Sequence, residues 1–561
     1  VVEIVPVEPA RMKDRTIIQW DKYDLDILGL LKVDVLSLGM LSAIQKCLTL
    51  LGNRYTFATI PAEDPDTYAL LRRGDAVGLF QVESRAQINM LGRLQPKTFY
   101  DLVIEVAIVR PGPIVGKMVH PYLKRRDGKE PISMPHPKLV PILKKTLGVP
   151  IFQEQVMQMA ISLAGFTPGE SDQLRKAMGV WGTKGNVNAM GERLRRGLLQ
   201  SGLPRGFVDQ VFEQIKGFAE YGFPESHAAS FALITYVSAY LKCHYPAEFI
   251  CSVMNSQPMG FYTNYSLIND VKRRGVKVLP VDLNRSVWDS QIEPDQKGQS
   301  QIRLGFREVK GMSESEYEAL SFQRSIREFE SVIDFLSRVS LRAHILERLA
   351  LGDVFREFGL DQRHALWEVL AHEDYLLAKA SPKRQLGLFD AFSEMECFQN
   401  DYESFRLSLR GHPMQVYRAK LTKLFRLKTI LTAQQIRSYE PQKHSKEPRV
   451  AVAGVAIVRQ RPPTAKGVVF ATIEDETGLV DLIFQKPVYE RYHEWLHSQG
   501  LWLVEGLLQM DRHARSVLVK KVSPLLPEDR QVQIRPKHTY FSVPKPASEG
   551  QTVSMKRIDR I

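Results

Sequence analysis

The sequence predicts a multidomain protein: a large, mainly α-helical domain, then a smaller helical region, then a small β-barrel. Two observations predict this order. From Leu41 to about Met254, apolar residues recur every three or four positions, which is the period of an amphipathic helix. After residue 448 the period changes to two, which is typical of half-buried strands. The length of 561 residues suits several units of this size.

The first part of the chain divides at about residue 40. Residues 1–40 are predicted to form strands and turns that end on a short apolar strand over residues 30–36. Residues 41–300 are predicted to form the large helical domain. Within it we expect a short strand over residues 276–280, followed by a polar stretch to Ser300.

The second part holds the smaller units. Residues 301–377 are predicted to be helical, mainly from Glu314 onward, and residues 378–447 to form a mixed linker region. In residues 448–525, about five short strands and one helix over residues 489–497 predict a barrel of the OB type. Residues 526–561 contain several Pro, Ser and Lys residues, and we expect a weakly ordered tail.

The charge balance favours a polyanionic partner. Lys and Arg exceed Asp and Glu by 76 − 63 = +13. No apolar run reaches the roughly 18 residues that span a bilayer, and no strongly amphipathic cationic helix suggests binding to a membrane surface. The four cysteines are far apart and form no C-x-x-C pair, so we expect reduced thiols in a cytoplasmic protein.

Lys32 and Asp34 form the first candidate site. Asp34 lies in an otherwise apolar strand, with Lys32 two residues earlier and therefore on the same face. A carboxylate buried on a strand is costly unless it is paired or bound to a metal ion. Phosphoryl transfer needs a carboxylate for Mg²⁺ and a nearby cation for the triphosphate. The alternative is a strand-end Asp that caps the following helix.

Three further groups could recognise phosphates. Arg110 precedes Pro-Gly-Pro, a rigid turn that would fix a guanidinium, although a solvated helix-joining turn is the alternative. Arg175 and Lys176 are adjacent cations on a predicted helix, where a solvated face is the usual interpretation. Ser226 could cap a helix that begins beside His227, although a lone histidine is more often a core or capping residue.

Read together, these segments closely resemble the C-family bacterial replicative polymerases of the DNA polymerase III alpha type. The resemblance covers residues 10 to about 525 and rests on the segments 19–22, 31–34, 78–85, 110–113, 153–157, 174–178 and 221–223. Residues 223–231 and 408–413 are most similar to the error-prone, damage-tolerant paralogue of that family. The resemblance implies DNA replication and repair by template-directed nucleotide addition, including translesion synthesis.

The resemblance implies a role for each candidate. Residues 1–40 would be the C-terminal piece of an α/β palm, with Asp34 as a catalytic, Mg²⁺-binding carboxylate and Lys32 against the incoming deoxynucleoside triphosphate. Residues 41–300 would be the fingers, with a nucleotide-binding surface formed by Arg110, Arg175, Lys176, Ser226 and His227.

The same resemblance implies that part of the enzyme is not in this chain. The family places two more catalytic aspartates upstream as Asp-x-Asp, and we do not assign Asp24 and Asp26 to that role because they are too close to Asp34. We therefore expect the C-terminal half of a polymerase, which needs an N-terminal half as partner and is inactive alone. The short segment after the barrel agrees with the error-prone branch. The alternative is a non-catalytic DNA-binding subunit of a split or degenerate polymerase.

Two more contacts follow from the resemblance. Residues 306–312 resemble a helix-hairpin-helix turn, in which Lys310 and Gly311 would meet a DNA phosphate of a primer-template. Ser313 stands where a second Gly is usual, and an ordinary helix–helix turn is the alternative. Residues 385–389 match a sliding-clamp-binding peptide, with contacts from Gln385, Leu386, Leu388 and Phe389, and an amphipathic linker as the alternative.

The barrel would bind single-stranded template. Its candidate contacts are cations spread over the predicted strands, which could line a groove for a phosphate backbone. Among them Arg459, Arg461 and Lys520 are the chosen sites, and the full set is Arg449, Arg459, Arg461, Lys466, Arg512, Arg515, Lys520 and Lys521.

Overall fold

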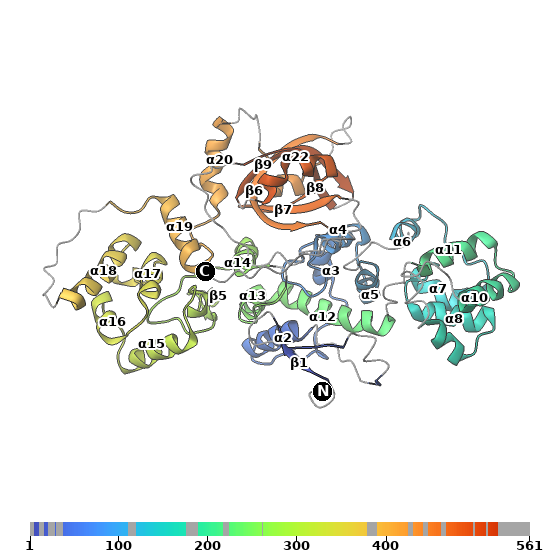
Figure 1. The fold of residues 1–561 in the computed structure, drawn as a ribbon, viewed down its shortest axis with the longest axis horizontal. Helices are drawn as coiled ribbons and strands as arrows, with labels where there is room; N and C mark the ends of the chain where they lie inside the picture. The colour runs from blue at the N-terminus through green and yellow to red at the C-terminus, as the bar shows by residue number, and fades with distance from the viewer. Residues whose placement is uncertain are drawn as a thin grey trace, which may run out of the picture.

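The computed structural model describes residues 5–10, 16–20, 28–29, 37–109, 119–175, 189–216, 224–260, 262–378, 390–424, 430–440, 447–461, 467–497, 500–511 and 514–524. Figure 1 shows three parts: a helical region that runs from the centre to the right, a second helical region on the left, and a barrel above the centre. This arrangement confirms the predicted fold class. No helix in the described ranges is both long and apolar enough to cross a membrane.

Two short strands lie near the start of the chain. β1 (Val7–Pro9) pairs antiparallel with β2 (Thr16–Ile18), and Val7 lies opposite Ile18. The predicted strand over residues 30–36, which carries Lys32 and Asp34, lies outside the described residues.

The large helical region contains the predicted succession of helices. Its elements are α2 (Leu38–Leu50), α3 (Pro65–Arg72), α4 (Arg85–Leu94), α5 (Phe99–Ile108), α6 (Val119–Arg126), η1 (Pro137–Leu139), α7 (Val140–Leu143), η2 (Lys144–Thr146), α8 (Gln153–Ala164), α10 (Ala189–Gln200), α11 (Arg205–Lys216), α12 (Glu225–His244), α13 (Pro246–Met254) and α14 (Asn264–Arg273). A further helix spans residues 168–175.

The helix α12 is the centre of this region. Its 20 residues extend about 30 Å at 1.5 Å per residue. Most of its residues from Ala228 to Lys242 are buried, and small and aromatic side chains occur on every side of the helix. A helix without a polar face is expected to be enclosed by other helices. α3, α5 and α13 all pack against it.

A buried ion cluster fixes α12 to its neighbours. The Lys242 side chain is fully buried, and its Nζ lies 3.0 Å from Asp75 Oδ1 and 2.9 Å from Asp270 Oδ2. It also donates to the carbonyl oxygen of Val77 at 2.7 Å. Arg274 pairs with Asp75 from the other side. Because the lysine and arginine charges stabilise the carboxylate, the pKa of Asp75 lies below its ordinary value despite burial.

A three-stranded sheet connects the two helical regions. β3 (Val278–Leu279) pairs with β5 (Ser300–Arg303), which pairs antiparallel with β4 (Gln291–Pro294). The strand expected over residues 276–280 is therefore present, but the polar stretch that follows also contains β4, which the sequence analysis missed. Its side chains are half-buried or exposed, so the apolar alternation that marks a strand is weak.

The second helical region begins at the predicted residue, Glu314. Ser313 caps the first helix together with Glu316, because the Ser313 side chain and the Glu316 carboxylate bond to each other's backbone N–H groups. The elements are η3 (Phe306–Glu308), α15 (Glu314–Ile326), α16 (Val332–Arg338), α17 (Ala343–Leu351), η4 (Arg356–Phe358), α18 (Gln362–Ala378), α19 (Glu394–Phe405), α20 (Pro413–Leu424) and α21 (Ala433–Arg437).

The predicted barrel is closed and has five strands. They are β6 (Arg449–Gln460), β7 (Val469–Asp475), β8 (Gly478–Phe484), β9 (Leu501–Asp511) and β10 (Ala514–Pro524), in the order β10-β8-β7-β6-β9. β10 closes the barrel by pairing parallel with β8. Trp502, Val504 and Val517 fill its core. The helix α22 (Lys486–His497) starts three residues before the predicted residue 489.

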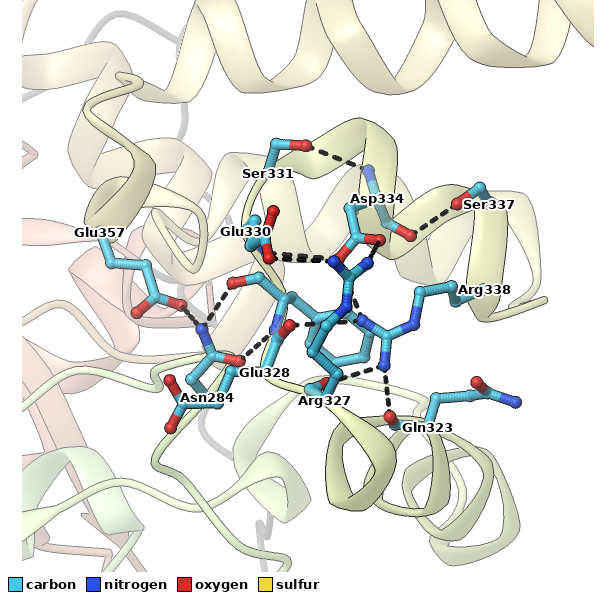
Figure 2. Close-up of polar contacts among 11 residues, drawn as sticks. Asn284, Gln323, Arg327, Glu328, Glu330, Ser331, Asp334, Ser337, Arg338 and Glu357 are labelled. Atoms are coloured by element: carbon cyan, nitrogen blue, oxygen red, sulfur yellow. Dashed lines mark hydrogen bonds and ion pairs between the residues drawn. The ribbon is translucent and has the colours of Figure 1, made fainter.

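Asn284 joins the turn after β3 to the turn between α15 and α16 (Figure 2). Its Nδ2 donates to the carbonyl oxygen of Phe329 and its Oδ1 accepts from the Phe329 N–H, both at 2.9 Å. Nδ2 also donates to Glu357 Oε1 at 3.2 Å. Beside this contact, Arg338 bonds Asp334 at 3.0 Å and lies over the Phe329 ring. The amide therefore satisfies both backbone groups of a buried residue.

We predict that Asn284→Ala loosens this turn. The substitution leaves the N–H and carbonyl groups of Phe329 without their partner, which costs about 2–3 kcal/mol. Hydrogen-exchange mass spectrometry should show amide exchange in residues 327–331 about 30- to 150-fold faster. The exposed Glu318 on α15 supplies the control, since Glu318→Ala should leave this exchange unchanged. Unaltered exchange in Asn284→Ala would contradict the assignment.

Candidate nucleic-acid interface

Two arginines at the end of β6 lie over aromatic rings of the barrel. The guanidinium carbon of Arg459 is 5.5 Å from the ring centre of Trp502, and that of Arg461 is 5.1 Å from the ring centre of Tyr489. Arg459 is half-buried, and burial lowers the pKa of its guanidinium below the ordinary value. Within the described part of the chain, neither arginine forms an ion pair with a carboxylate. An anion placed here would meet charges that no carboxylate neutralises.

A β-bulge exposes a pair of lysines on β10. The pairing of β10 with β9 shifts register between Val519 and Lys521, so Lys520 is the extra residue. As a result, the neighbouring side chains of Lys520 and Lys521 are both exposed, although side chains normally alternate along a strand. Lys521 Nζ lies 3.3 Å from Glu505 Oε1, so part of its charge is offset. Lys520 remains the stronger candidate for contact with a phosphate.

The aromatic partners were missed by the sequence analysis. Trp502 lies on β9 and Tyr489 on α22, both far from residues 459–461 in the chain. Only the closed barrel brings them beneath the arginines. Of the other barrel candidates, Arg449 is exposed at the start of β6 and Arg515 is half-buried on β10. Lys466 and Arg512 lie outside the described residues.

The hairpin at Lys310 and Gly311 is held from two sides. Arg342 Nη2 donates to the Gly311 carbonyl oxygen at 2.7 Å, and Arg348 Nη1 donates to the Lys310 carbonyl oxygen. Gly311 adopts φ 84°, and a Cβ there would come within 2.8 Å of Arg348 Nη1. Glycine is therefore favoured by the backbone conformation, and a larger residue would also have to displace the end of the Arg348 side chain.

Most N–H groups of this hairpin have partners within the chain. The Lys310 N–H donates to the Ser404 carbonyl oxygen at 2.8 Å, and the Met312 N–H donates to that of Val309 at 3.2 Å. The Ser313 N–H donates to Glu316 Oε2. A phosphate at this hairpin would thus depend on the Gly311 N–H and on the Lys310 charge, not on a row of backbone donors.

The N-terminal end of α12 gathers several of the motif segments. The Glu225 N–H donates to Glu154 Oε2 at 3.0 Å, which brings α8 to this end of α12. The Phe231 ring packs edge-on against Phe80, with ring centres 5.1 Å apart. His227 also lies against Phe231, with ring centres 4.1 Å apart. Residues 78–85, 153–157 and 224–231, far apart in the sequence, therefore meet here.

Ser226 does not cap α12, so that prediction was wrong. The capping residue is Pro224, which makes no side-chain bond to the helix. Ser226 lies within the first turn and is exposed. The N–H of Glu225, the first residue of the helix, instead donates to the carboxylate of Glu154 on α8.

Arg175 lies on the helix over residues 168–175, which packs on α8. Ser171 Oγ on this helix donates to the Met157 carbonyl oxygen at 3.1 Å. Arg175 Nε lies 2.9 Å from Asp172 Oδ1, and about a third of the arginine side chain is exposed. Arg175, Ser226 and His227 are thus on helices that share α8 as a neighbour.

The remaining candidates lie outside the described residues. They are Lys32, Asp34, Arg110, Lys176, Gln385, Leu386, Leu388 and Phe389. Among the residues that the structure describes, no group of three or more His, Cys, Asp or Glu side chains is arranged to hold a metal ion. Asp34, where Mg²⁺ is expected, lies outside the described residues, so its metal site stays a prediction.

Two family models match the chain. Residues 40–202 match the finger domain of the bacterial DNA polymerase III alpha subunit. Residues 275–365 match the helix-hairpin-helix motif, and this range contains the hairpin of Lys310 and Gly311.

Curated relatives match nearly the whole chain. An error-prone DNA polymerase of Pseudomonas fluorescens Pf-5 is 45% identical over 551 residues, covering 93% of this chain and 52% of the relative. Error-prone DNA polymerases of Alkalilimnicola ehrlichii and Methylococcus capsulatus are 47% and 46% identical, covering 90% of this chain and 49% and 50% of their own lengths. The chain therefore spans about half the length of the curated relatives it matches. These matches confirm the resemblance inferred from the motifs.

Proposed function

We propose that this chain, of the DNA polymerase III alpha type, is the C-terminal portion of an error-prone DNA polymerase. The complete enzyme would add deoxynucleotides to a primer under the direction of a template, including across damaged template. The observation that carries the proposal is the 45–47% identity to error-prone DNA polymerases through nine-tenths or more of the chain. The match of residues 40–202 to a polymerase finger domain agrees with it.

The incoming nucleotide would bind the fingers beside the N-terminal end of α12. Ser226 and His227 lie in the first turn of this helix. The carboxylate of Glu154 already accepts the Glu225 N–H there, so the proposed phosphate contacts are the side chains of Ser226 and His227. Arg175 on the neighbouring helix would add positive charge, together with Lys32, Arg110 and Lys176. Cations around a triphosphate offset its charge and hold it in line for transfer.

Asp34 would be one carboxylate of the catalytic Mg²⁺ site. When bound, the metal ions stabilise the charge that develops on the transferring phosphate. One carboxylate is too few for two ions, so the remaining ligands would come from an N-terminal polymerase half. This chain alone is then expected to lack polymerase activity.

We predict that co-expression with an N-terminal half that supplies Asp-x-Asp gives primer extension, and that this chain alone gives none. Asp34→Ala in the complex should lower the rate on the order of 100-fold or more, because an electrostatic contact to the reacting phosphate is lost. Asp24→Ala is the matched control and should retain activity, because Asp24 is not assigned to the site. Equal rates for Asp34→Ala and the wild type would favour a non-catalytic DNA-binding subunit.

DNA would contact the chain at two places. Lys310 and Gly311 would meet a phosphate of the primer-template duplex, and the barrel would hold the single-stranded template. Arg461 and the half-buried ring of Tyr489 beneath it support the second contact, because single-strand sites combine cations for the backbone with accessible rings for the bases. The ring of Trp502 lies in the barrel core and serves only to hold Arg459.

We predict that Arg459→Ala, Arg461→Ala and Lys520→Ala together weaken binding to single-stranded DNA on the order of 100-fold at about 0.1 M salt. Each lost phosphate contact makes the dependence of affinity on salt shallower by about 0.7, so three should reduce this slope by about 2. Fluorescence anisotropy of a labelled oligothymidylate measures both quantities.

The control removes equal charge from exposed positions on the fingers, through Lys97→Ala, Lys124→Ala and Arg205→Ala. This triple variant should keep both the affinity and the slope within about twofold. A similar loss in both triple variants would mean that the barrel contributes only general charge.

The sliding clamp is the proposed protein partner, bound through residues 385–389. Leu388 and Phe389 would enter an apolar pocket of the clamp while Gln385 bonds its rim and Leu386 adds apolar contact. We predict that Leu388→Ala with Phe389→Ala abolishes capture of the chain by immobilised bacterial sliding clamp, since both apolar anchors are lost. Ser381→Ala with Pro382→Ala, just upstream, should be captured like the wild type. Capture of the Leu388 and Phe389 variant at wild-type level would contradict this partner.

A further inference from the structure

Two arginines from different parts of the chain form ion pairs with the turn between β7 and β8. Arg273, at the end of α14 in the fingers, bonds Glu474 Oε1 at 3.0 Å. Arg418, on α20, bonds Asp475 Oδ2 at 3.1 Å and Glu476 Oε2 at 2.9 Å. Glu474 and Asp475 are almost completely buried. We call these two arginines and three carboxylates the barrel joint.

The joint also reaches the second helical region. Lys272, beside Arg273, donates to the Leu409 carbonyl oxygen at 3.1 Å. Arg410 then bonds Asp353 at 2.9 Å and lies 3.3 Å from Asp401. The fingers, the helix-hairpin-helix region and the barrel therefore meet within a few residues of one another. Figure 1 shows the barrel directly above α14 at this place.

The centre of the joint is polar. Burial, together with the charges of Arg273 and Arg418, lowers the pKa of His412 to about 3, so the ring is neutral. Its Nδ1 accepts the Met414 N–H at 3.1 Å, which leaves the proton on Nε2. His412 Nε2 and Glu474 Oε2 are buried without a hydrogen-bond partner among the described residues. Buried groups of this kind usually bind ordered water.

The ion pairs of the barrel joint are buried, so breaking them costs more free energy than breaking ordinary surface pairs. Burial raises the pKa of Glu474 to about 7 against the opposing effect of Arg273. Loss of a partner from a buried pair typically costs about 3–5 kcal/mol, because a charge remains without compensation. A released barrel would instead expose Glu474 to water. Removing the arginines therefore weakens the attachment of the barrel at this turn and leaves the packing of β10 against α4.

The joint holds the turn between β7 and β8, and Arg459 and Arg461 lie further along β6 from it. Glu474 lies opposite Val455 on β6, whereas Arg459 lies opposite Ala471, further along the same pair of strands. Fixing the β7–β8 turn thus fixes the direction in which the Arg459 and Arg461 surface faces, relative to the fingers.

We propose that Arg273 and Arg418 of the barrel joint hold the barrel in one orientation. In this orientation, a single strand on the barrel and a duplex on the helix-hairpin-helix region can belong to one continuous primed template, which binds at both sites. This inference rests on the proposed function. Such an orientation would raise the affinity for the primed template, because DNA bound at one of the two sites meets the other site at a high effective concentration. This gain requires that the two sites are already held in the right relative orientation.

The test compares this chain with its Arg273→Gln and Arg418→Gln double variant. Small-angle X-ray scattering should show a larger radius of gyration for the double variant, because the barrel is released. Its affinities for a single-stranded oligonucleotide and for a blunt duplex should stay within about twofold of wild type. Its affinity for the primed template that joins the two should fall about tenfold.

Two further variants keep the test decisive. Arg273→Gln with Glu474→Gln removes one pair as a unit and leaves no uncompensated charge, so it should fold and show the same selective loss in smaller degree. Arg285→Gln with Arg327→Gln, both at exposed positions away from the joint, removes equal charge and should show no selective loss.

An unchanged radius of gyration, or a released barrel with full affinity for the primed template, would overturn the proposal. An equal loss for the single strand and the primed template would overturn it as well, because the barrel itself would then be impaired. If the wild type bound none of the three DNA probes, the proposed function would fail, and with it the inference that rests on it.

Discussion

The buried charge of Lys242 is the constraint on which the rest of the structure depends. A fully buried ammonium is tolerable only while both carboxylates, Asp75 and Asp270, stay within bonding distance. This requirement fixes α14 on α12. The two residues that follow Val271 on α14 then make the contacts to the rest of the chain, Lys272 to Leu409 and Arg273 to Glu474. One buried lysine thereby determines where the barrel is attached.

Local patterns predicted the parts of the fold that have a clear period. The alternation of residues such as Val450 and Val452 identified the barrel strands, and the helical period identified the start of α15 at Glu314. The strand β4 was missed because its side chains are only half-buried or exposed, so the apolar alternation is weak. The start of α12 was misplaced because the group that satisfies its first N–H, Glu154, is 71 residues away. Such a partner has no local signal.

The residues of the candidate nucleic-acid interface also divide into those that local sequence predicts and those that depend on tertiary contacts. Arg459, Arg461 and Lys520 could be proposed from residue type and predicted strands. Their aromatic neighbours Trp502 and Tyr489 could not, since the pairing depends on barrel closure. The hairpin at Gly311 was found by resemblance, but the use of its N–H groups by Ser404 and Glu316 depends on tertiary contacts. The catalytic roles of Lys32 and Asp34 are predictions from the motif.

Because Lys520 is an extra residue in β10, the alternation of inward and outward side chains shifts by one position there. Val517 and Val519 face the barrel interior two residues apart, and the next inward side chain is Val522, three residues on. Deleting Lys520 would place Val522 two residues after Val519, so Val522 would still face inward and the pairing with β9 would become regular. The hydrophobic filling of the barrel therefore does not require the extra residue. What the extra residue provides is the outward display of two adjacent positive charges, and a shorter β10 would keep the barrel while losing one of them.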